Sequence, residues 1–260
     1  MMTRQEAPFR VITCADAGYF PFLPFLERNI ARKFGRLPVI YDLGLTDDQR
    51  PQLASELRQA ADVPADFRGT EQRHGFVRAT HKPACIRDSL DRDPGGCLCV
   101  DADVLFLGRL DLRDFQSADV AVTPRHPKER TPAHLDNGRI NTGVLFFSGS
   151  PRSRRLLADW QHACETGTDS DQKCLSDLLG DFDLSGPLGL ADSDALSLAK
   201  LDPCIYNDVR QRTGRILHFK NAGRDPGAAR KLATYRRLEE NHPILLAALH
   251  RFRRLVRGME

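Results

Sequence analysis

The chain has 260 residues, 41% of them hydrophobic and 28% charged, and its formal net charge is only +3. This balance is typical of a globular protein and gives no support for a nucleic-acid partner. No apolar run reaches the length of a membrane-spanning helix, and the N-terminus lacks a basic segment followed by an apolar core, so we expect a cytoplasmic protein. The seven scattered cysteines favour reduced thiols over a disulfide framework.

Hydrophobic patterning and turn residues predict alternating strands and helices. We expect strands over residues 9–14, 37–42, 97–107, 118–123, 140–147 and 215–220. We expect helices over residues 19–34, 83–90, 151–164, 171–179 and 238–257, with a further helix cap at Thr46. Residues 51–75 resist assignment, and residues 124–138, 180–193 and 221–227 have the composition of loops. The alternation predicts an α/β fold with a mostly parallel central sheet in a single domain, 1–260.

The most informative stretch is Cys97–Gly108, an apolar run that carries Asp101 and Asp103. Burying an unpaired carboxylate is costly, but two carboxylates at i and i+2 of an extended chain can share Mg²⁺ or Mn²⁺. They fall at the carboxyl end of a strand, where α/β sheets bind ligands. The alternative is a solvated strand end, since short Asp-x-Asp strings occur by chance. Cys97 and Cys99 lack the second pair that a zinc site needs, so we expect small buried hydrophobes.

Several short motifs follow one another along residues 9–224. They are Asp101-Ala102-Asp103, Asn141-Thr142-Gly143-Val144-Leu145, Asp171-Gln172, Tyr206-Asn207 and His218-Phe219-Lys220, preceded by turns containing Tyr19 and Asp42-Leu43-Gly44-Leu45. Each motif is weak alone, but the ordered set resembles the A-type-fold nucleotide-sugar glycosyltransferases, particularly the glycogenin and bacterial lipopolysaccharide galactosyltransferase family. The resemblance implies a Rossmann-like sheet flanked by helices, with a nucleotide-binding part (about 9–123), an acceptor and catalytic part (about 124–224) and a basic helical segment (about 228–260).

The resemblance also implies a metal site. Asp101, Asp103 and His218 match the positions that hold Mn²⁺ or Mg²⁺ in this family, where the ion bridges the diphosphate of a nucleotide sugar and neutralises charge on the leaving group. Without the carboxylates, His218 would be interpreted as a structural histidine.

Other positions match the donor site of the family. Lys82, Lys220 and Arg224 are candidates for phosphate contacts, with solvated side chains as the alternative. The nucleoside-binding edge corresponds to Thr13, Ala15, Asp16 and Tyr19, although Tyr19 could equally be a half-buried helix residue. Ala102, Thr142 and Gly143 complete the expected donor-binding set. Gly143 would permit the backbone to approach the ligand closely.

The implied catalytic residues are Asp171, Gln172 and Asn141. Asp171 and Gln172 resemble the pair that lies under the reacting sugar, and Asp171 is the leading catalytic candidate. Asn141 offers both donor and acceptor groups to sugar hydroxyls. The alternative is that it only forms a turn at the start of the strand. Helix capping by the acidic cluster Asp169-Ser170-Asp171 is the rival interpretation, and both roles could hold.

The sequence departs from the family pattern in two places. Residues 220–226 replace the usual Gly and the downstream Lys-Pro-Trp after His218-Phe219, so the exact phosphate ligand stays open. Residues 180–202 have no clear counterpart and are candidates to shape the acceptor site.

We therefore expect metal-dependent transfer of a sugar from a nucleoside diphosphate donor to a hydroxyl group. By resemblance the donor is a UDP-sugar, configuration is retained, and the acceptor is a surface glycan, lipopolysaccharide core, lipid-linked or protein acceptor. No second carboxylate is an obvious nucleophile, which favours front-face attack.

One alternative is a haloacid-dehalogenase-type phosphatase with Asp101 as nucleophile, though such an aspartate normally lies on the first strand. The other is an inactive relative that binds nucleotide or glycan.

The predicted C-terminal helix is basic and carries several leucines. It either rests peripherally on an anionic membrane surface at the cytoplasmic face or packs on the protein with a solvated basic face.

Overall fold

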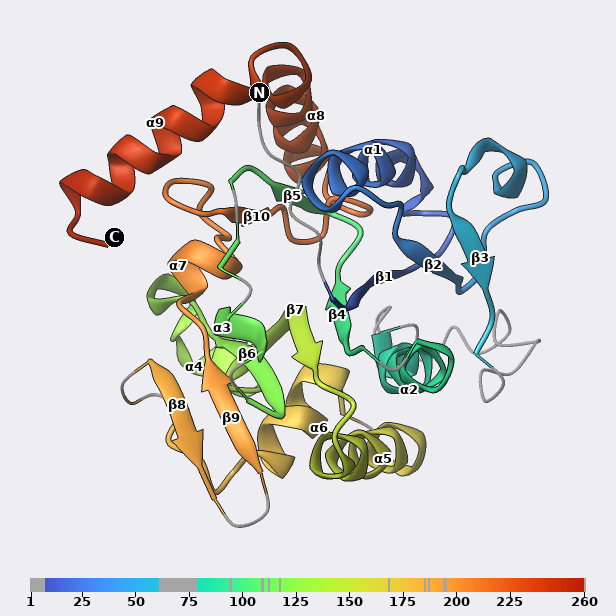
Figure 1. The fold of residues 1–260 in the computed structure, drawn as a ribbon, viewed down its shortest axis with the longest axis vertical. Coiled ribbons are helices and arrows are strands. Elements are labelled where there is room, and N and C mark those ends of the chain that lie inside the picture. The colour runs from blue at the N-terminus through green and yellow to red at the C-terminus, as the bar shows by residue number, and fades with distance from the viewer. Residues whose placement is uncertain are drawn as a thin grey trace.

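The structure, a computed structural model, describes residues 8–60 and 79–259 except positions 94, 109, 112, 117, 168, 185, 187, 194 and 195. Of the unassigned segment 51–75, the part beyond residue 60 falls outside the described residues. A central sheet runs through the molecule, and helices pack on both of its faces (Figure 1). Among the described residues, no helix combines the length and hydropathy that a bilayer crossing requires.

The strands and helices occur in the order in which Figure 1 labels them. The strands are β1 (Arg10–Ala15), β2 (Val39–Asp42), β3 (Glu56–Arg58), β4 (Cys97–Val100), β5 (Val104–Phe106), β6 (Val120–Pro124), β7 (Ile140–Phe147), β8 (Gly189–Asp192), β9 (Ser197–Lys200) and β10 (Ile216–His218). The helices are α1 (Leu23–Phe34), α2 (Lys82–Arg92), α3 (Arg113–Gln116), α4 (Pro132–Leu135), α5 (Pro151–Thr166), α6 (Asp171–Leu178), α7 (Pro203–Tyr206), α8 (Pro226–Asn241) and α9 (Pro243–Val256).

The main sheet has the strand order β3-β2-β1-β4-β7-β6-β9-β8, and β10 and β5 form a separate two-stranded ribbon. The α/β class is confirmed. The expected parallel arrangement holds for β3, β2, β1 and β4 and for the pair β6 and β9. It fails for β7, which is antiparallel to both β4 and β6, and for β8 beside β9. A hydrophobic pattern locates a buried strand but not its direction, because either direction buries the same faces.

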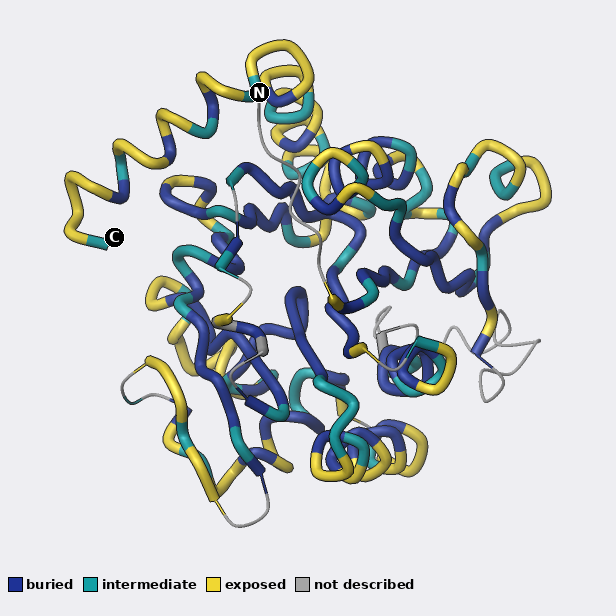
Figure 2. Tube along the Cα trace, in the orientation of Figure 1, coloured by how far each residue is buried: buried dark blue, intermediate teal, exposed yellow. Residues whose placement is uncertain are grey.

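Side chains of the central strands alternate between two hydrophobic cores. In β4, Cys97 and Cys99 pack into the core that includes residues of α2 and α5, whereas Leu98 and Val100 pack into the core that includes residues of α1. Both cysteines are fully buried, so the expectation that they are small buried hydrophobes is confirmed. Figure 2 shows these central strands as the buried middle of the molecule. One sheet thus spans the predicted nucleotide-binding and acceptor parts.

The expected strand over 97–107 is in fact two strands. β4 ends at Val100, and the chain leaves the main sheet before β5 pairs with β10. The Asp101 backbone N–H donates to the carbonyl oxygen of Gly143 (3.0 Å), which holds the start of this turn against β7. The two carboxylates therefore lie in the turn at the carboxyl end of β4.

The expected C-terminal helix over 238–257 is wrong in extent, because α8 and α9 meet at His242 and Pro243. A proline disfavours helical backbone at the residue before it, and His242 has φ −138° and ψ 52°. The break sends α9 in a new direction along the edge of the molecule (Figure 1).

The remaining differences concern short elements. Thr46 begins no α-helix; its N–H donates to Gln49 Oε1 (3.0 Å), and a 3₁₀ turn follows at Arg50–Gln52. The loops expected over 124–138 and 180–193 contain α4 and β8, and β3, β9 and α7 have no clear sequence signal. Such short runs do not define a hydrophobic period.

Candidate active site

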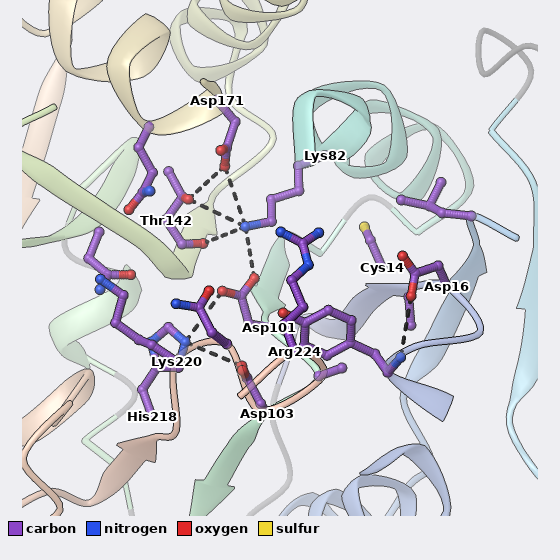
Figure 3. Close-up of a pocket in the computed structure, with 17 residues that line it drawn as sticks. Cys14, Asp16, Lys82, Asp101, Asp103, Thr142, Asp171, His218, Lys220 and Arg224 are labelled. Atoms are coloured by element: carbon purple, nitrogen blue, oxygen red, sulfur yellow. Dashed lines mark hydrogen bonds and ion pairs between the residues drawn. The ribbon is translucent and has the colours of Figure 1, made fainter. Parts of the chain in front are cut away.

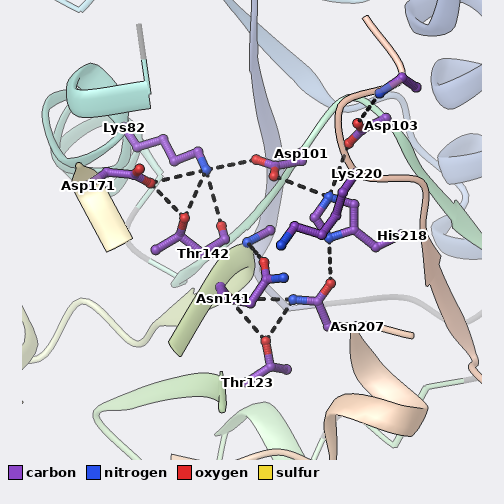
Figure 4. Close-up of polar contacts among 12 residues, drawn as sticks. Lys82, Asp101, Asp103, Thr123, Asn141, Thr142, Asp171, Asn207, His218 and Lys220 are labelled. Atoms are coloured by element: carbon purple, nitrogen blue, oxygen red, sulfur yellow. Dashed lines mark hydrogen bonds and ion pairs between the residues drawn. The ribbon is translucent and has the colours of Figure 1, made fainter. Parts of the chain in front are cut away.

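Two segments that are distant in the sequence meet at the end of β4. β10 pairs antiparallel with β5 so that His218 lies opposite Val104, and Phe219 N donates to the carbonyl oxygen of Asp103 (3.0 Å). This register places the His218 ring beside both carboxylates of the turn (Figure 4). The short ribbon of β5 and β10 therefore builds the centre of the site.

Asp101, Asp103 and His218 form a cluster whose potential ligand atoms all lie within 4.8 Å of one another. His218 Nε2 is 3.3 Å from Asp103 Oδ1 and 3.5 Å from Asp101 Oδ2. His218 and Asp103 are buried, whereas Asp101 is partly exposed. Asp103 Oδ1 accepts no hydrogen bond from the residues that the structure describes, which is costly for a buried oxygen unless a ligand completes its shell. Two carboxylates and an imidazole fit a divalent cation such as Mn²⁺ or Mg²⁺.

Asn207 sets the orientation of the His218 ring. Asn207 Oδ1 lies 2.7 Å from His218 Nδ1, and the Asn207 amide nitrogen donates to Thr123 Oγ1 (2.8 Å). The Thr123 hydroxyl donates in turn to the carbonyl oxygen of Asn141 (3.1 Å), so the amide of Asn207 is held with its oxygen toward His218. Nδ1 then carries the ring proton, and the lone pair of Nε2 faces the two carboxylates.

Gly143 makes room for the same ring. A Cβ atom at this position would lie 2.6 Å from His218 Nδ1, closer than Cβ atoms approach other heavy atoms. The Gly143 N–H donates to Asn141 Oδ1 (2.9 Å), which fixes the backbone here. The structure thus places Gly143 against a predicted metal ligand, whereas the sequence interpretation placed it against the donor sugar.

Lys82 links carboxylates on two sides of the site. Its Nζ is 2.8 Å from Asp101 Oδ1 and 3.4 Å from Asp171 Oδ2, and it donates to the hydroxyl and carbonyl oxygens of Thr142 at 3.3 Å. Burial opposes the charge of this ammonium group, but Asp101 and Asp171 outweigh burial, and the pKa of Lys82 lies well above its usual value. Lys82 is therefore a buried, charged bridge between the metal cluster and Asp171.

Asp171 begins α6 but does not cap it. The cap is Ser170, whose Oγ accepts a hydrogen bond from a backbone N–H of the first turn. The Asp171 carboxylate instead accepts the hydroxyl hydrogen of Thr142 (2.6 Å) and faces Lys82. Its carbonyl oxygen accepts from Trp160 Nε1 (2.9 Å), which ties the start of α6 to α5. The Asp171 side chain is thus directed into the site.

The cluster, Lys82 and Asp171 open into one pocket (Figure 3). Its lining residues are Cys14, Ala15, Asp16, Tyr19, Leu43, Lys82, Asp101, Ala102, Asp103, Asn141, Thr142, Asp171, Gln172, His218, Lys220, Asn221 and Arg224. All the residues predicted for the site line this pocket except Thr13, which is fully buried in β1, and Gly143, which lies behind His218.

Asp16 and Tyr19 shape the edge of the pocket that follows β1. Asp16 Oδ1 accepts hydrogen bonds from the backbone N–H groups of Gly18 (2.8 Å) and Tyr19 (3.3 Å), which fixes the turn. Burial raises the pKa of Tyr19, and the carboxylates of Asp103 and Asp101 add to the increase. Tyr19 therefore keeps its proton and presents an uncharged ring.

Lys220 and Arg224 lie on the segment that follows β10. Lys220 Nζ is 2.9 Å from Glu129 Oε1. Burial acts to raise the pKa of Glu129, but Lys220 outweighs it, and this pKa lies below its usual value. Arg224 is exposed on the pocket lining.

Sequence reasoning did not assign Cys14, Leu43 and Asn221 to the site. It named the Tyr206-Asn207 motif but gave Asn207 no role, which only the contact with His218 reveals. Segment 180–202 forms the hairpin of β8 and β9, and none of its described residues lines this pocket.

Known nucleotide-sugar transferases are similar to this chain in part of its sequence and in its fold. Residues 95–189 match Nucleotid_trans, the nucleotide-diphospho-sugar transferase family, and this segment contains Asp101, Asp103 and Asp171. The galactosyltransferase LgtC, solved with donor and acceptor sugar analogues, matches the structure with a TM-score of 0.52 and 15% identity, over 87% of this chain and 96% of LgtC. Part of the sequence is thus similar to the nucleotide-diphospho-sugar transferases, and the fold is that of such glycosyltransferases.

Two further solved structures are similar to this chain. An active-site mutant of LgtC has a TM-score of 0.51 and 15% identity, over 87% of this chain and 96% of the mutant. A glycosyltransferase involved in glycosylation of the major capsid of PBCV-1 has a TM-score of 0.49 and 12% identity, over 82% of this chain and 94% of that one. No curated protein matches the sequence. The predicted resemblance to A-type glycosyltransferases is confirmed, and at these identities the likeness to solved structures concerns the fold.

Proposed function

We propose that the protein transfers a sugar from a nucleoside diphosphate donor, with UDP as the expected nucleotide, to a hydroxyl group of an acceptor glycan. The observation that carries this proposal is the cluster of Asp101, Asp103 and His218 at the pocket that also contains Lys82 and Asp171. A carboxylate–imidazole cluster beside a buried lysine is suited to hold a diphosphate through a divalent cation.

The donor set of the cluster and the unpartnered Asp103 Oδ1 fit Mn²⁺ or Mg²⁺ held by Asp101, Asp103 and His218. Such an ion, when bound, neutralises negative charge on the departing nucleoside diphosphate. Lys220 and Arg224 supply further positive charge for the phosphates. The edge formed by Ala15, Asp16 and Tyr19 supports binding of the base and ribose, and Ala102 and Thr142 line the donor side of the pocket.

The catalytic assignments rest on Asp171, Gln172 and Asn141. Asn141 Nδ2 is buried and has no acceptor among the described residues, so it can donate to a sugar hydroxyl oxygen. The Asp171 carboxylate is already engaged by Thr142 and Lys82, which weakens it as a nucleophile. This supports charge stabilisation by Asp171 and front-face attack with retention over a covalent glycosyl intermediate.

The proposal can be tested by thermal unfolding against a panel of nucleoside diphosphates and nucleotide sugars, each with Mn²⁺ and with a chelator. A ligand that binds only the native state raises the melting temperature by mass action. We expect one nucleotide to raise it with Mn²⁺ and not with chelator, and Asp103→Ala to abolish the increase while Asp181→Asn, an exposed control, keeps it. If no nucleotide raises the melting temperature, the proposed donor chemistry is wrong.

We also propose that α9 contacts an anionic membrane surface peripherally, which would place the enzyme close to a lipid-linked acceptor. Ile244, Leu245, Phe252 and Val256 are more than half exposed on this basic helix, a pattern typical of helices that lie in the membrane interface. The expected result is that Ile244→Ser/Phe252→Ser loses cosedimentation with phosphatidylglycerol vesicles and keeps its melting temperature. Unchanged cosedimentation would show that these side chains of α9 do not bind the membrane surface.

A further inference from the structure

A second hollow lies outside the donor pocket, between the turn that connects α7 to β10, helix α8 and the end of α9. We call it the arginine hollow, and it is lined by Arg210, Gln211, Arg212, Tyr235, Arg253 and Arg257. Four of these six side chains are guanidinium groups, and none is a carboxylate. Arginine offers a planar fork of donors that matches phosphate oxygens, so this composition indicates an anionic ligand.

The turn that carries Arg210 and Arg212 is fixed by Asp208. Asp208 Oδ2 accepts hydrogen bonds from the backbone N–H groups of Arg212, Thr213 and Gly214 at 2.6–2.8 Å, and Oδ1 accepts from Arg210 N at 2.8 Å. The Asp208 carboxylate is therefore buried and engaged by backbone N–H groups. It orders the turn, and it forms no ion pair with the guanidinium groups of Arg210 and Arg212.

The two helices are tied to the same turn. Tyr235 of α8 donates its hydroxyl hydrogen to the carbonyl oxygen of Gln211 (3.0 Å), and the buried Arg254 of α9 donates from Nη1 to the carbonyl oxygen of Thr213 (2.8 Å). Arg253 lies in the last turn of α9 and Arg257 is the residue that ends the helix, and both line the hollow. The hollow is thus a built structure with arginines on two of its walls.

The electrostatics of the arginine hollow are unfavourable without a ligand. None of its four arginine side chains forms an ion pair with another described residue. Arg253 and Arg257 line one hollow with Arg210 and Arg212, and like charges that are held close together repel one another. An anion with several oxygens would relieve this repulsion and accept hydrogen bonds from more than one arginine.

A basic groove joins the arginine hollow to the donor pocket. The groove shares Arg210 and Gln211 with the hollow and Lys220 with the donor pocket, and Lys128 and Lys231 also line it. Its two carboxylates are engaged: Glu129 pairs with Lys220 (2.9 Å), and Asp225 accepts from the backbone N–H of Gly227 (2.8 Å). An extended ligand could therefore occupy the hollow with one end and reach the donor pocket with the other.

We propose that the arginine hollow binds a phosphate group of the acceptor, so that the enzyme uses acceptors bearing a phosphate at some distance from the reacting hydroxyl. The acceptor assignment rests on the proposed function, whereas binding of phosphate by these arginines does not. A soluble phosphorylated glycan and a phospholipid-linked glycan present the same chemistry to the arginines.

The test measures binding of inorganic pyrophosphate by isothermal titration calorimetry in the presence of chelator. We expect Arg212→Gln/Arg257→Gln to bind about tenfold more weakly or worse than the wild type, because two charge-assisted contacts are lost. The matched control Arg155→Gln/Arg237→Gln removes two exposed arginines that lie outside the hollow and should bind as the wild type does. Equal affinity of the hollow variant, or an equal loss in the control, would overturn the proposal.

Vesicles distinguish the source of the phosphate. Binding to phosphatidylcholine vesicles that contain phosphatidic acid, lost in Arg212→Gln/Arg257→Gln and kept in Arg155→Gln/Arg237→Gln, would assign a lipid phosphate. Binding of pyrophosphate without such vesicle binding would assign a soluble phosphorylated group. If the wild type binds single-stranded RNA more tightly than pyrophosphate, and Arg212→Gln/Arg257→Gln loses this binding, the hollow binds nucleic acid. That result would overturn the acceptor assignment. A wild type that binds pyrophosphate here but no nucleotide with Mn²⁺ would contradict the proposed function alone.

Discussion

His218 Nδ1 and Asn207 Oδ1 are 2.7 Å apart, and this contact decides which face of the imidazole is available to a metal ion. Because the Asn207 amide is also held by Thr123 (2.8 Å), it cannot rotate without losing a second hydrogen bond. A ligand histidine usually donates its other ring N–H to such a fixed acceptor, which sets its tautomer and orientation. Asn207 is therefore a positioning residue that acts through His218.

Replacing Asn207 should weaken metal binding. We expect Asn207→Leu to lower Mn²⁺ affinity about 10- to 100-fold, as loss of an outer-shell partner typically does. Isothermal titration calorimetry with Mn²⁺ alone measures this without any turnover. Asn207→Asp keeps an oxygen toward Nδ1 and should retain most of the affinity, so an equal loss in both variants would show that Asn207 matters for packing and not for ring orientation.

Gly143 should be intolerant of even one added methyl group. Gly143→Ala places a Cβ 2.6 Å from His218 Nδ1, so the ring must move away from the carboxylates. We expect a loss of about 1–3 kcal/mol in the free energy of unfolding from overpacking, together with weaker Mn²⁺ binding. Gly108→Ala is the matched control, because its Cβ would meet Arg215 at an ordinary 3.6 Å. Equal Mn²⁺ affinity in both variants would contradict the role of Gly143.

Asp171→Asn should separate donor binding from turnover. The substitution keeps the shape of the side chain but removes the charge that faces Lys82 at 3.4 Å. We expect nucleotide-sugar affinity to change little and kcat to fall about 100-fold or more, because stabilisation of developing charge is lost. Asp169→Asn, an exposed neighbour, should be fully active. A fully active Asp171→Asn enzyme would exclude Asp171 from catalysis.

The stability of the protein should decrease in mild acid because of His250. This side chain is 1% exposed, and neither ring nitrogen has a hydrogen-bond partner among the described residues. Burial, aided by Arg253, lowers the pKa of His250 to about 4. An unfolded chain binds this proton near pH 6.5, so the unfolded state gains protons first as the pH falls, and the free energy of unfolding decreases between about pH 6.5 and 4.

The expected decrease from this residue is at most about 3 kcal/mol. Urea unfolding at a series of pH values measures it, and His250→Leu should remove this part of the pH dependence. A His250→Leu variant with the same pH profile as the wild type would show that other groups cause the loss of stability.

The sequence by itself determined the α/β class, the long central strands and most of the residues that line the pocket. Asp101 and Asp103 follow a strongly apolar strand, and the carboxyl ends of strands bind ligands in such folds, so local pattern was enough to locate them. The resemblance to a glycosyltransferase family then implied His218, Asp171 and Lys82, all of which the structure brings to the same pocket.

Only the tertiary structure decided how these residues act on one another. The antiparallel ribbon of β5 and β10 brings His218 to Asp103, and neither strand is long enough to define its partner or direction from periodicity. The roles of Asn207 and Gly143 depend on the position of one imidazole ring, and the arginine hollow depends on a helix break at His242 that was not anticipated. The physical reason is common to all three: hydrophobic pattern reports which side chains are buried, whereas hydrogen bonding and charge depend on which segments meet.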